Sequence, residues 1–144
     1  MLAPVLPEEV QFFLQDVVDS SFDNLEVLRL LWSHADSAWS PRRVAAELGT
    51  SESLAEEVLQ LLCRRRLVVA VAGDGIARYA YRPQTRELGE LVTKGMLTYQ
   101  ERRIDVVTAL TSGALSRMHQ TLSTLSLILA RASLRRAVRK PSPS

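Results

Sequence analysis

Apolar residues near the start of the chain recur at the spacing of one helix face. The positions concerned are Val10, Phe13, Leu14, Val17 and Val18. They lie three or four residues apart, so a helix places all of them on one side. Pro7 and the acidic pair Glu8 and Glu9 favour a helix start, because proline needs no amide partner in the first turn and carboxylates stabilise the positive end of the helix dipole. The pattern predicts an N-terminal amphipathic helix within residues 1–22.

Two shorter helices are predicted next. Asp23 and Glu26 have the spacing of a reciprocal N-terminal cap, which predicts a second helix that ends near Asp36. Its buried side is expected to hold Leu25, Leu28, Leu31 and Trp32. Ser40 can then cap a third helix that begins at Pro41, since serine accepts a hydrogen bond from a free amide and proline suits the first helical position.

A tight turn is predicted between the third helix and a fourth one over residues 51–66. Gly49 can adopt the left-handed geometry that ends a helix, and Ser51 can cap the next. At 100° per residue the fourth helix is amphipathic. Its apolar arc holds Leu54, Ala55, Val58, Leu61 and Leu62, and its polar arc holds Ser53, Glu56, Glu57, Gln60 and Arg64. The spacing predicts a helix-turn-helix with the polar arc facing outward.

A β-hairpin is predicted directly after these helices. The segment "LVVAVAGDGIARYAYR" has two β-branched and aromatic runs around a Gly-Asp-Gly turn, whose residues tolerate positive φ. On the return strand, alternation puts Tyr79 and Tyr81 on one face and Arg78, Ala80 and Arg82 on the other. We expect the tyrosines to point inward and the arginines outward.

The C-terminal part is predicted to be helical and to join two copies of the chain. Residues 85–111 have helical composition and would form a helix of about 40 Å, which we expect to bend at Ser112 and Gly113. Beyond the bend, a coiled-coil-like seam predicts a homodimer interface. The seam consists of Leu115, Met118, Leu122, Leu125 and Leu129. Residues 141–144 are expected to be a disordered tail.

The order of these elements resembles a known fold. Helix, helix, tight turn, helix and hairpin over residues 23–83 resemble the winged helix-turn-helix of bacterial regulators of the MarR, ArsR and PadR kinds. The resemblance is carried by "VAAELGTSESLAEEVLQLL" and "LVVAVAGDGIARYAYRP", and "TYQERRIDVV" resembles a segment of small bacterial winged-helix proteins of unassigned role. It implies a mainly α protein with a small β wing, a C-terminal dimerisation region over residues 84–140, and a cytoplasmic transcription regulator. One departure is Arg66, where such domains often have glycine.

The net charge of +2 conceals two halves of opposite sign. Residues 1–62 contain 3 Lys/Arg and 11 Asp/Glu, a net charge of −8, whereas residues 63–144 contain 15 and 5, a net charge of +10. An anionic partner is therefore expected to meet the second half. The final basic residues are Arg131, Arg135, Arg136, Arg139 and Lys140. They suit nucleic acid, an anionic lipid surface, or an acidic patch such as the first half of the chain itself.

Two functions fit these features, namely DNA binding and protein binding. The candidate DNA contacts are Arg42, Arg43, Ser51, Ser53, Gln60, Arg64, Arg78 and Arg82. DNA binding is favoured by the fold and by the wing arginines, because arginines on phosphates supply most non-specific affinity. Against it, Glu52, Glu56 and Glu57 lie on the helix that would enter the major groove, where a carboxylate neutralises no phosphate. We favour a dimeric DNA-binding regulator, with a protein-binding or assembly module as the alternative.

Other chemistry finds little support in the sequence. Cys63 is the single cysteine, so no disulfide can form within the chain, and with only His34 and His119 beside it no multidentate Cys/His metal site is expected. We expect Cys63 to be a packing residue rather than a nucleophile, although the neighbouring arginines would favour its thiolate. The least charged stretch, 106–130, contains Arg117 and many polar residues. We predict neither an enzyme, a cofactor nor an integral membrane protein.

Overall fold

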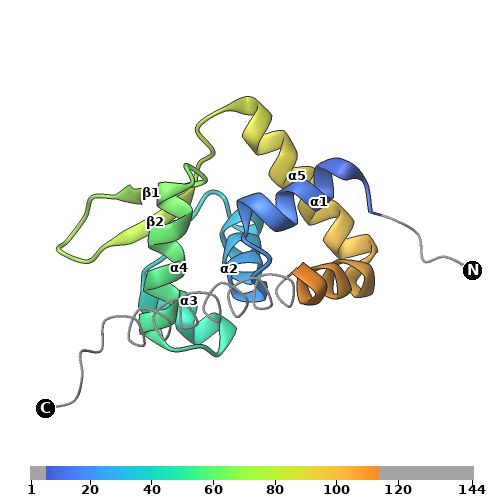
Figure 1. The fold of residues 1–144 in the computed structure, drawn as a ribbon. Helices are drawn as coiled ribbons and strands as arrows, with labels where there is room; N and C mark the ends of the chain where they lie inside the picture. Colours follow the sequence, from blue (N-terminus) through green and yellow to red (C-terminus); the bar gives the residue numbers. More distant parts are fainter. Residues whose placement is uncertain (1–5, 114–144) are drawn as a thin grey trace, which may run out of the picture.

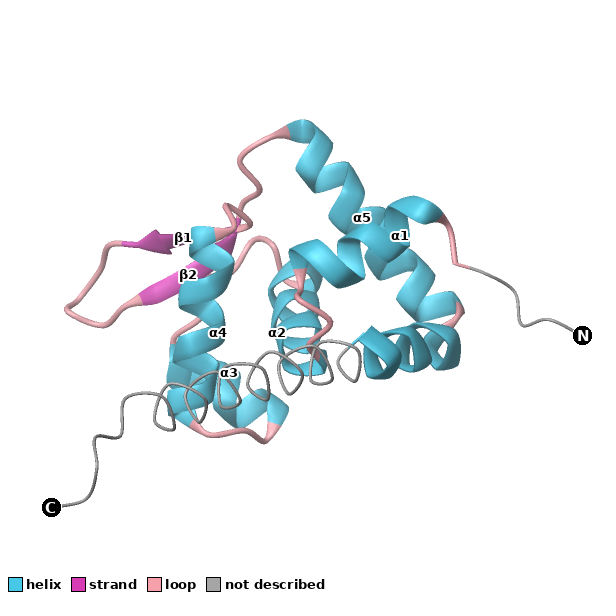
Figure 2. Cartoon of the chain, viewed as in Figure 1, coloured by secondary structure: helices cyan, strands magenta, loops and turns pink. Residues whose placement is uncertain are grey.

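The computed structural model describes residues 6–113 and is mainly helical with one small antiparallel sheet (Figure 1). The elements are α1 (Glu8–Phe12), the π-helical turn η1 (Phe13–Val17), α2 (Phe22–Ser33), α3 (Pro41–Leu48), α4 (Glu52–Arg64), β1 (Val68–Val71), β2 (Arg78–Tyr81) and α5 (Arg86–Glu101). Residues 103–113 are again helical. The hairpin projects away from the helices as a wing (Figure 2). The predicted fold class is therefore confirmed.

The N-terminal helix packs against α5 through the apolar stripe that the sequence predicts. All five stripe residues from Val10 to Val18 are buried. The packing is close because α5 has a glycine at the crossing: a Cβ on Gly95 would overlap the ring of Phe13. After η1 the chain turns sharply through Asp19 and Ser20, both at positive φ.

Helix α2 begins and ends earlier than predicted. Its N-cap is Ser21, whose Oγ accepts a hydrogen bond from the amide of Asn24 at 3.2 Å, so the predicted cap at Asp23 is wrong. The left-handed turn at Asp19 and Ser20 explains the shift, because it delivers Ser21 in the extended conformation that a capping residue needs. The helix ends at Ser33 and not near Asp36.

The helix-turn-helix matches its sequence prediction closely. Ser40 caps α3 and Ser51 caps α4, each through a hydrogen bond from the third amide along the chain. Between them Gly49 adopts the left-handed conformation, with φ of 71°. The buried face of α4 consists of Ala55, Val58, Leu59 and Leu62, while Leu54 and Leu61 are half-buried.

The wing is a two-stranded sheet in which Val68 pairs with Tyr81 and Val71 with Arg78. Trp39 extends this sheet, because its backbone exchanges two hydrogen bonds with Tyr79, at 2.7 and 2.8 Å. Tyr79 is buried, Tyr81 is half-buried, and Arg78 and Arg82 are exposed, as the alternation predicts. Ala80 is also buried, so its predicted place on the outward face is wrong. Between α4 and the wing, Arg66 adopts a positive φ of 64°, so this arginine occupies the left-handed position for which glycine is favoured.

The C-terminal helix breaks earlier than the sequence suggests. Helix α5 ends at Glu101, with Arg102 at φ −128° and ψ 52°, whereas Ser112 and Gly113 are helical. The expected single helix over residues 85–111 is therefore wrong. In the helix that follows the break, Val106 and Leu110 enter the core, whereas Ile104 is 82% exposed.

Candidate nucleic-acid interface

The predicted contact residues of α3 lie at its exposed N-terminal turn. Arg42 and Arg43 are both exposed. The guanidinium of Arg43 lies over the ring of Trp39, 4.2 Å from its centroid, and such a cation–π contact contributes about 0.5–1 kcal/mol at an exposed site. Because Trp39 pairs with Tyr79, the start of α3 and strand β2 are held together. The structure thus brings the arginines of α3 beside the base of the wing.

The predicted contact residues of α4 are polar, and some of them already form hydrogen bonds within the chain. Ser51 is occupied as the helix cap, since its Oγ accepts a hydrogen bond from the Leu54 amide at 3.1 Å. Gln60 donates to a carboxylate oxygen of Glu56 at 3.5 Å, the long limit of a hydrogen bond. Ser53 is exposed. The exposed face of α4 therefore carries the hydroxyl of Ser53 and the amide of Gln60 near the carboxylate of Glu56. The one arginine of α4 lies at the end of the helix.

That arginine, Arg64, is turned toward α2 instead of the wing. It lines a shallow hollow of about 270 Å³ together with Glu57, Ser21, Asp23 and Asn24. Arg64 therefore borders the start of α2, and its predicted contact with DNA stays a prediction. Glu57 borders the same hollow, whereas Glu52 and Glu56 do not.

The wing has one arginine at each end of β2 and an exposed isoleucine in its loop. Arg78 begins β2, and Arg82 follows its end, where the amide of Arg82 donates to the carbonyl of Leu67 at 3.0 Å. Both side chains are exposed. The tip contains Asp74 and Ile76, and Ile76 is 54% exposed. The two arginines therefore lie at opposite ends of the strand, with Arg82 next to the helices and Arg78 next to the loop.

Arg65 has a structural role that the sequence does not reveal. Its Nη2 lies 2.7 and 2.9 Å from the two carboxylate oxygens of Asp19, and its Nη1 donates to the carbonyl of Asp16. The guanidinium therefore ties the end of α4 to the turn after η1. Asp19 lies so far back in the sequence that no local spacing indicates this pair.

The groups between α4 and the wing are poorly placed to ionise. Burial raises the pKa of the Cys63 thiol, and the lowering effect of Arg64 does not overcome it. Burial also raises the pKa of Tyr79, and the nearby Cys63 and Glu56 add to this effect. The structure therefore supports a packing role for Cys63, since a neutral thiol is a weak nucleophile.

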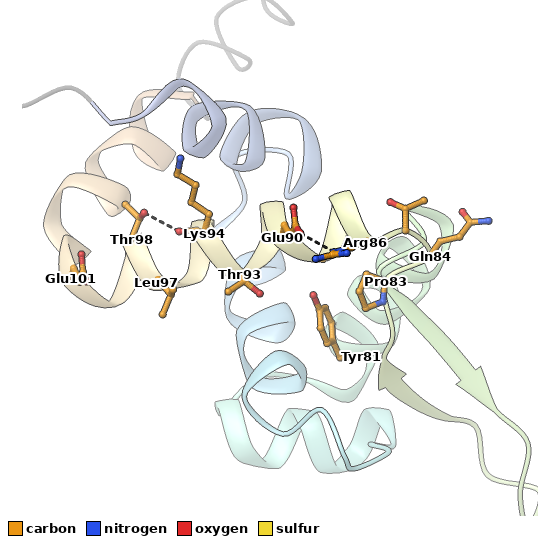
Figure 3. A pocket seen from close by; sticks show the side chains of 12 residues that line it. Tyr81, Pro83, Gln84, Arg86, Glu90, Thr93, Lys94, Leu97, Thr98 and Glu101 are labelled. Atoms are coloured by element: carbon orange, nitrogen blue, oxygen red, sulfur yellow. Dashed lines mark hydrogen bonds and ion pairs between the residues drawn. The ribbon is translucent and has the colours of Figure 1, made fainter.

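A groove on α5 has no counterpart among the sequence predictions. It encloses about 840 Å³ and is lined by residues that include Tyr81, Pro83, Gly89, Thr93, Leu97 and Thr98 (Figure 3). Two of its charges are paired, Arg86 with Glu90 at 3.1 Å and Lys94 with Glu9 of α1. The Tyr81 hydroxyl is buried without a hydrogen-bond partner in the described part of the chain, and burial raises its pKa to about 12. The only sequence signal is the four-residue spacing of Gly89, Thr93 and Leu97 along one helix face.

The described residues provide no clustered metal ligands. His34 is exposed, and its Nδ1 lies 3.1 Å from the carbonyl of Leu30, so it sits at the end of α2 as a capping residue. Within residues 6–113 no three His, Cys, Asp or Glu side chains come together. Over the same residues, no helix combines the length and the apolar character needed to cross a bilayer.

The sequence matches no protein-family model and no curated protein. Solved structures do resemble it. One is the homodimeric winged helix-turn-helix DNA-binding domain of Mb0332 from Mycobacterium bovis, a possible ArsR-family transcriptional regulator, with 18% identity, 70% of this chain and 93% of that chain covered, and a TM-score of 0.50. Another is a MepR mutant from S. aureus bound to an oligodeoxyribonucleotide, with 16% sequence identity and a TM-score of 0.51. The match covers 85% of this chain and 88% of the MepR chain.

These similarities establish the fold. The chain is a winged helix-turn-helix protein, in which α3 and α4 form the helix-turn-helix and β1 and β2 the wing. The resemblance to winged-helix regulators that the sequence predicts is confirmed at the level of the fold. The dimer seam from Leu115 to Leu129 and the basic residues from Arg131 to Lys140 lie outside the described residues.

Proposed function

We propose that this protein is a DNA-binding transcriptional regulator that acts as a homodimer. The observation that carries the proposal is that four exposed arginines lie on the two elements next to α4: Arg42 and Arg43 on α3, and Arg78 and Arg82 on or beside the wing. None of them forms an ion pair with another residue of the described range. Their charges are therefore free to meet phosphates. The Mb0332 domain is homodimeric and DNA-binding, and the MepR mutant binds an oligodeoxyribonucleotide, which supports the same role here.

The proposed contact is made mainly to the DNA backbone. In a helix-turn-helix protein the second helix enters the major groove, which here brings Glu52 and Glu56 toward the phosphates. Like charges at close range in a partly desolvated groove cost about 1 kcal/mol or more each. Flanking arginines gain affinity by releasing counterions, whatever the base sequence. Affinity should therefore depend strongly on salt and only weakly on sequence.

The proposed homodimer uses the C-terminal seam and part of the α5 surface. Leu97 lies in the groove of α5 with 48% of its surface exposed, and Ile104 follows the break at Arg102 with 82% exposed. Both side chains are large, apolar and exposed, which favours a place for them in a subunit contact. We therefore add Leu97 and Ile104 to the predicted seam residues.

A protein-binding module is the second candidate. It is favoured by the exposed carboxylates of Glu52 and Glu56 and by the exposed Ile76 in the wing loop. These groups suit a basic or apolar protein surface better than a polyanion.

One experiment separates the two functions. The full chain is titrated into a fluorescent duplex of arbitrary sequence, followed by anisotropy, at salt concentrations from about 50 mM to about 200 mM. A DNA-binding regulator gives binding that weakens steeply over this range. The protein-binding alternative gives no binding at any of these concentrations, and that result would refute our proposal.

A further inference from the structure

The exposed surface of α4 carries three carboxylates that form no ion pair within the described part of the chain, although one of them, Glu57, borders the same hollow as Arg64. Glu52, Glu56 and Glu57, which we call the acidic face, are all exposed. None of the three forms an ion pair with another residue between 6 and 113. Glu52 and Glu56 lie one turn apart, where like charges destabilise a helix. A positively charged segment placed on this face would relieve that repulsion.

The described chain ends close to this face. Gly113 packs so tightly on Ser20 that a Cβ at position 113 would overlap the Ser20 hydroxyl. The residue after Ser20, Ser21, lines the same shallow hollow as Glu57. Gly113 and the acidic face are thus connected through neighbouring residues of one surface. The chain therefore continues beyond Gly113 from a point next to α4 and not from the far side of the molecule.

The C-terminal sequence has the charge and the length to reach the acidic face. Residues 131–140, "RASLRRAVRK", contain five basic residues and no acidic one. Residues 114–130 connect them to Gly113, and a connection of this length spans about 25 Å as a helix and about 55 Å when extended. Helix α4 is itself about 20 Å long at 1.5 Å per residue. A tether of this length keeps the basic segment at a high effective concentration near α4.

From these observations we propose that the acidic face of α4 is a docking surface for the basic segment 131–140 of this chain. The charges are complementary, whereas DNA phosphates have the same sign as the face. Docking places the segment on the helix that a helix-turn-helix protein presents to DNA. This interaction goes beyond the proposed function, since it requires no DNA and assigns a partner to a surface that repels phosphates.

Paramagnetic NMR on the full-length chain tests the proposal. A Cys63→Ala, Ser142→Cys background places a nitroxide just beyond the basic segment, and the spectrum with reduced label gives the reference. We expect the amides of residues 52–57 to lose at least half of their signal, while those of residues 86–90 keep theirs. Raising the salt to about 1 M, where the Debye length falls to about 3 Å, restores the lost signals. Mixing labelled and isotope-enriched copies shows which subunit supplies the segment.

Two triple variants that remove the same charge from different places show whether the signal loss depends on the acidic face. Glu52→Gln, Glu56→Gln and Glu57→Gln together are expected to restore the α4 signals, whereas Glu8→Gln, Glu87→Gln and Glu101→Gln, which remove the same charge from exposed sites elsewhere, leave the broadening unchanged. Broadening that persists in the α4 variant, that falls on α5, or that is absent overturns the proposal. Because the measurement contains no DNA, its failure leaves the proposed DNA binding intact.

Discussion

The Arg65 guanidinium lies 2.7 and 2.9 Å from the two carboxylate oxygens of Asp19, and this pair fixes the end of α4 against the N-terminal helix. Such a two-oxygen contact is more specific than an ordinary surface ion pair. Both side chains are partly exposed, at 37% and 26%, so solvent screening limits the contribution of the pair.

Arg65→Gln should therefore lower the free energy of unfolding by about 1 kcal/mol, which urea denaturation can measure. Arg86→Gln is the control. It removes an ion pair with Glu90 that is far more exposed, and it should have almost no effect. Equal losses in the two variants would show that the Arg65 contact has no special role.

Gly95→Ala should destabilise the fold by about 1–3 kcal/mol, because the added methyl group would overlap the Phe13 ring and force α5 away from η1. Gly73→Ala, in the wing turn with open space around it, provides the matched control and should be nearly neutral. Thermal unfolding of both variants measures the difference. Similar stability in the two would mean that α5 does not cross the N-terminal helix as closely as described.

Tyr81 predicts a loss of stability at alkaline pH. Burial raises the pKa of its hydroxyl to about 12, above the usual value of 10.0. Between these values the unfolded chain loses the proton while the folded chain keeps it, so the free energy of unfolding falls as the pH rises from about 10 to about 12. Tyr81→Phe should reduce this fall in urea titrations at several pH values. The remaining slope reflects Tyr79 and Tyr99, whose pKa values are also raised by burial. An unchanged slope in the variant would contradict the assignment to Tyr81.

The dimer proposal predicts that a charge at the exposed apolar positions separates the subunits. Ile104→Lys combined with Leu97→Lys should halve the mass measured by light scattering, as should polar substitution at Leu122 and Leu125, and the circular dichroism of the winged helix should remain. Phe22→Lys introduces the same charge at an exposed apolar residue of α2 and should leave the mass unchanged. A full mass in the Ile104 and Leu97 variant would exclude this surface from the interface.

The elements that could be predicted are those whose signals are local. Ser40, Gly49 and Ser51 each act on amides or carbonyls within a few residues, and the alternation of Tyr79 and Tyr81 follows from strand geometry alone. The cap of α2 could not be predicted, because two non-glycine residues before it adopt left-handed φ, which no propensity suggests. The break at Arg102 has no local signal either, because it results from the packing of Val106 and Leu110 into the core, a long-range effect.

In the candidate site, too, features that depend on local periodicity could be predicted, and features that depend on long-range packing could not. The outward direction of Ser53, Glu56 and Arg78 follows from helix and strand periodicity, and all three are exposed. The position of Arg64 beside the start of α2 could not be predicted, because it depends on which helix packs against that side of α4. The hollow shared with Ser21 and the ion pair of Arg65 with Asp19 both join segments far apart in the chain.

The proposed function requires that the exposed arginines of α3 and the wing, the two neighbours of the acidic helix α4, bind DNA phosphates. Its most direct test is the slope of log affinity against log salt for the chain with Arg42→Gln, Arg78→Gln and Arg82→Gln. Each lost phosphate contact should reduce the slope by about 0.9, and affinity should fall for every duplex tested. A control with Arg64→Gln, Arg86→Gln and Arg103→Gln has the same net charge and should keep the original slope. Equal slopes in the two variants would contradict the claim.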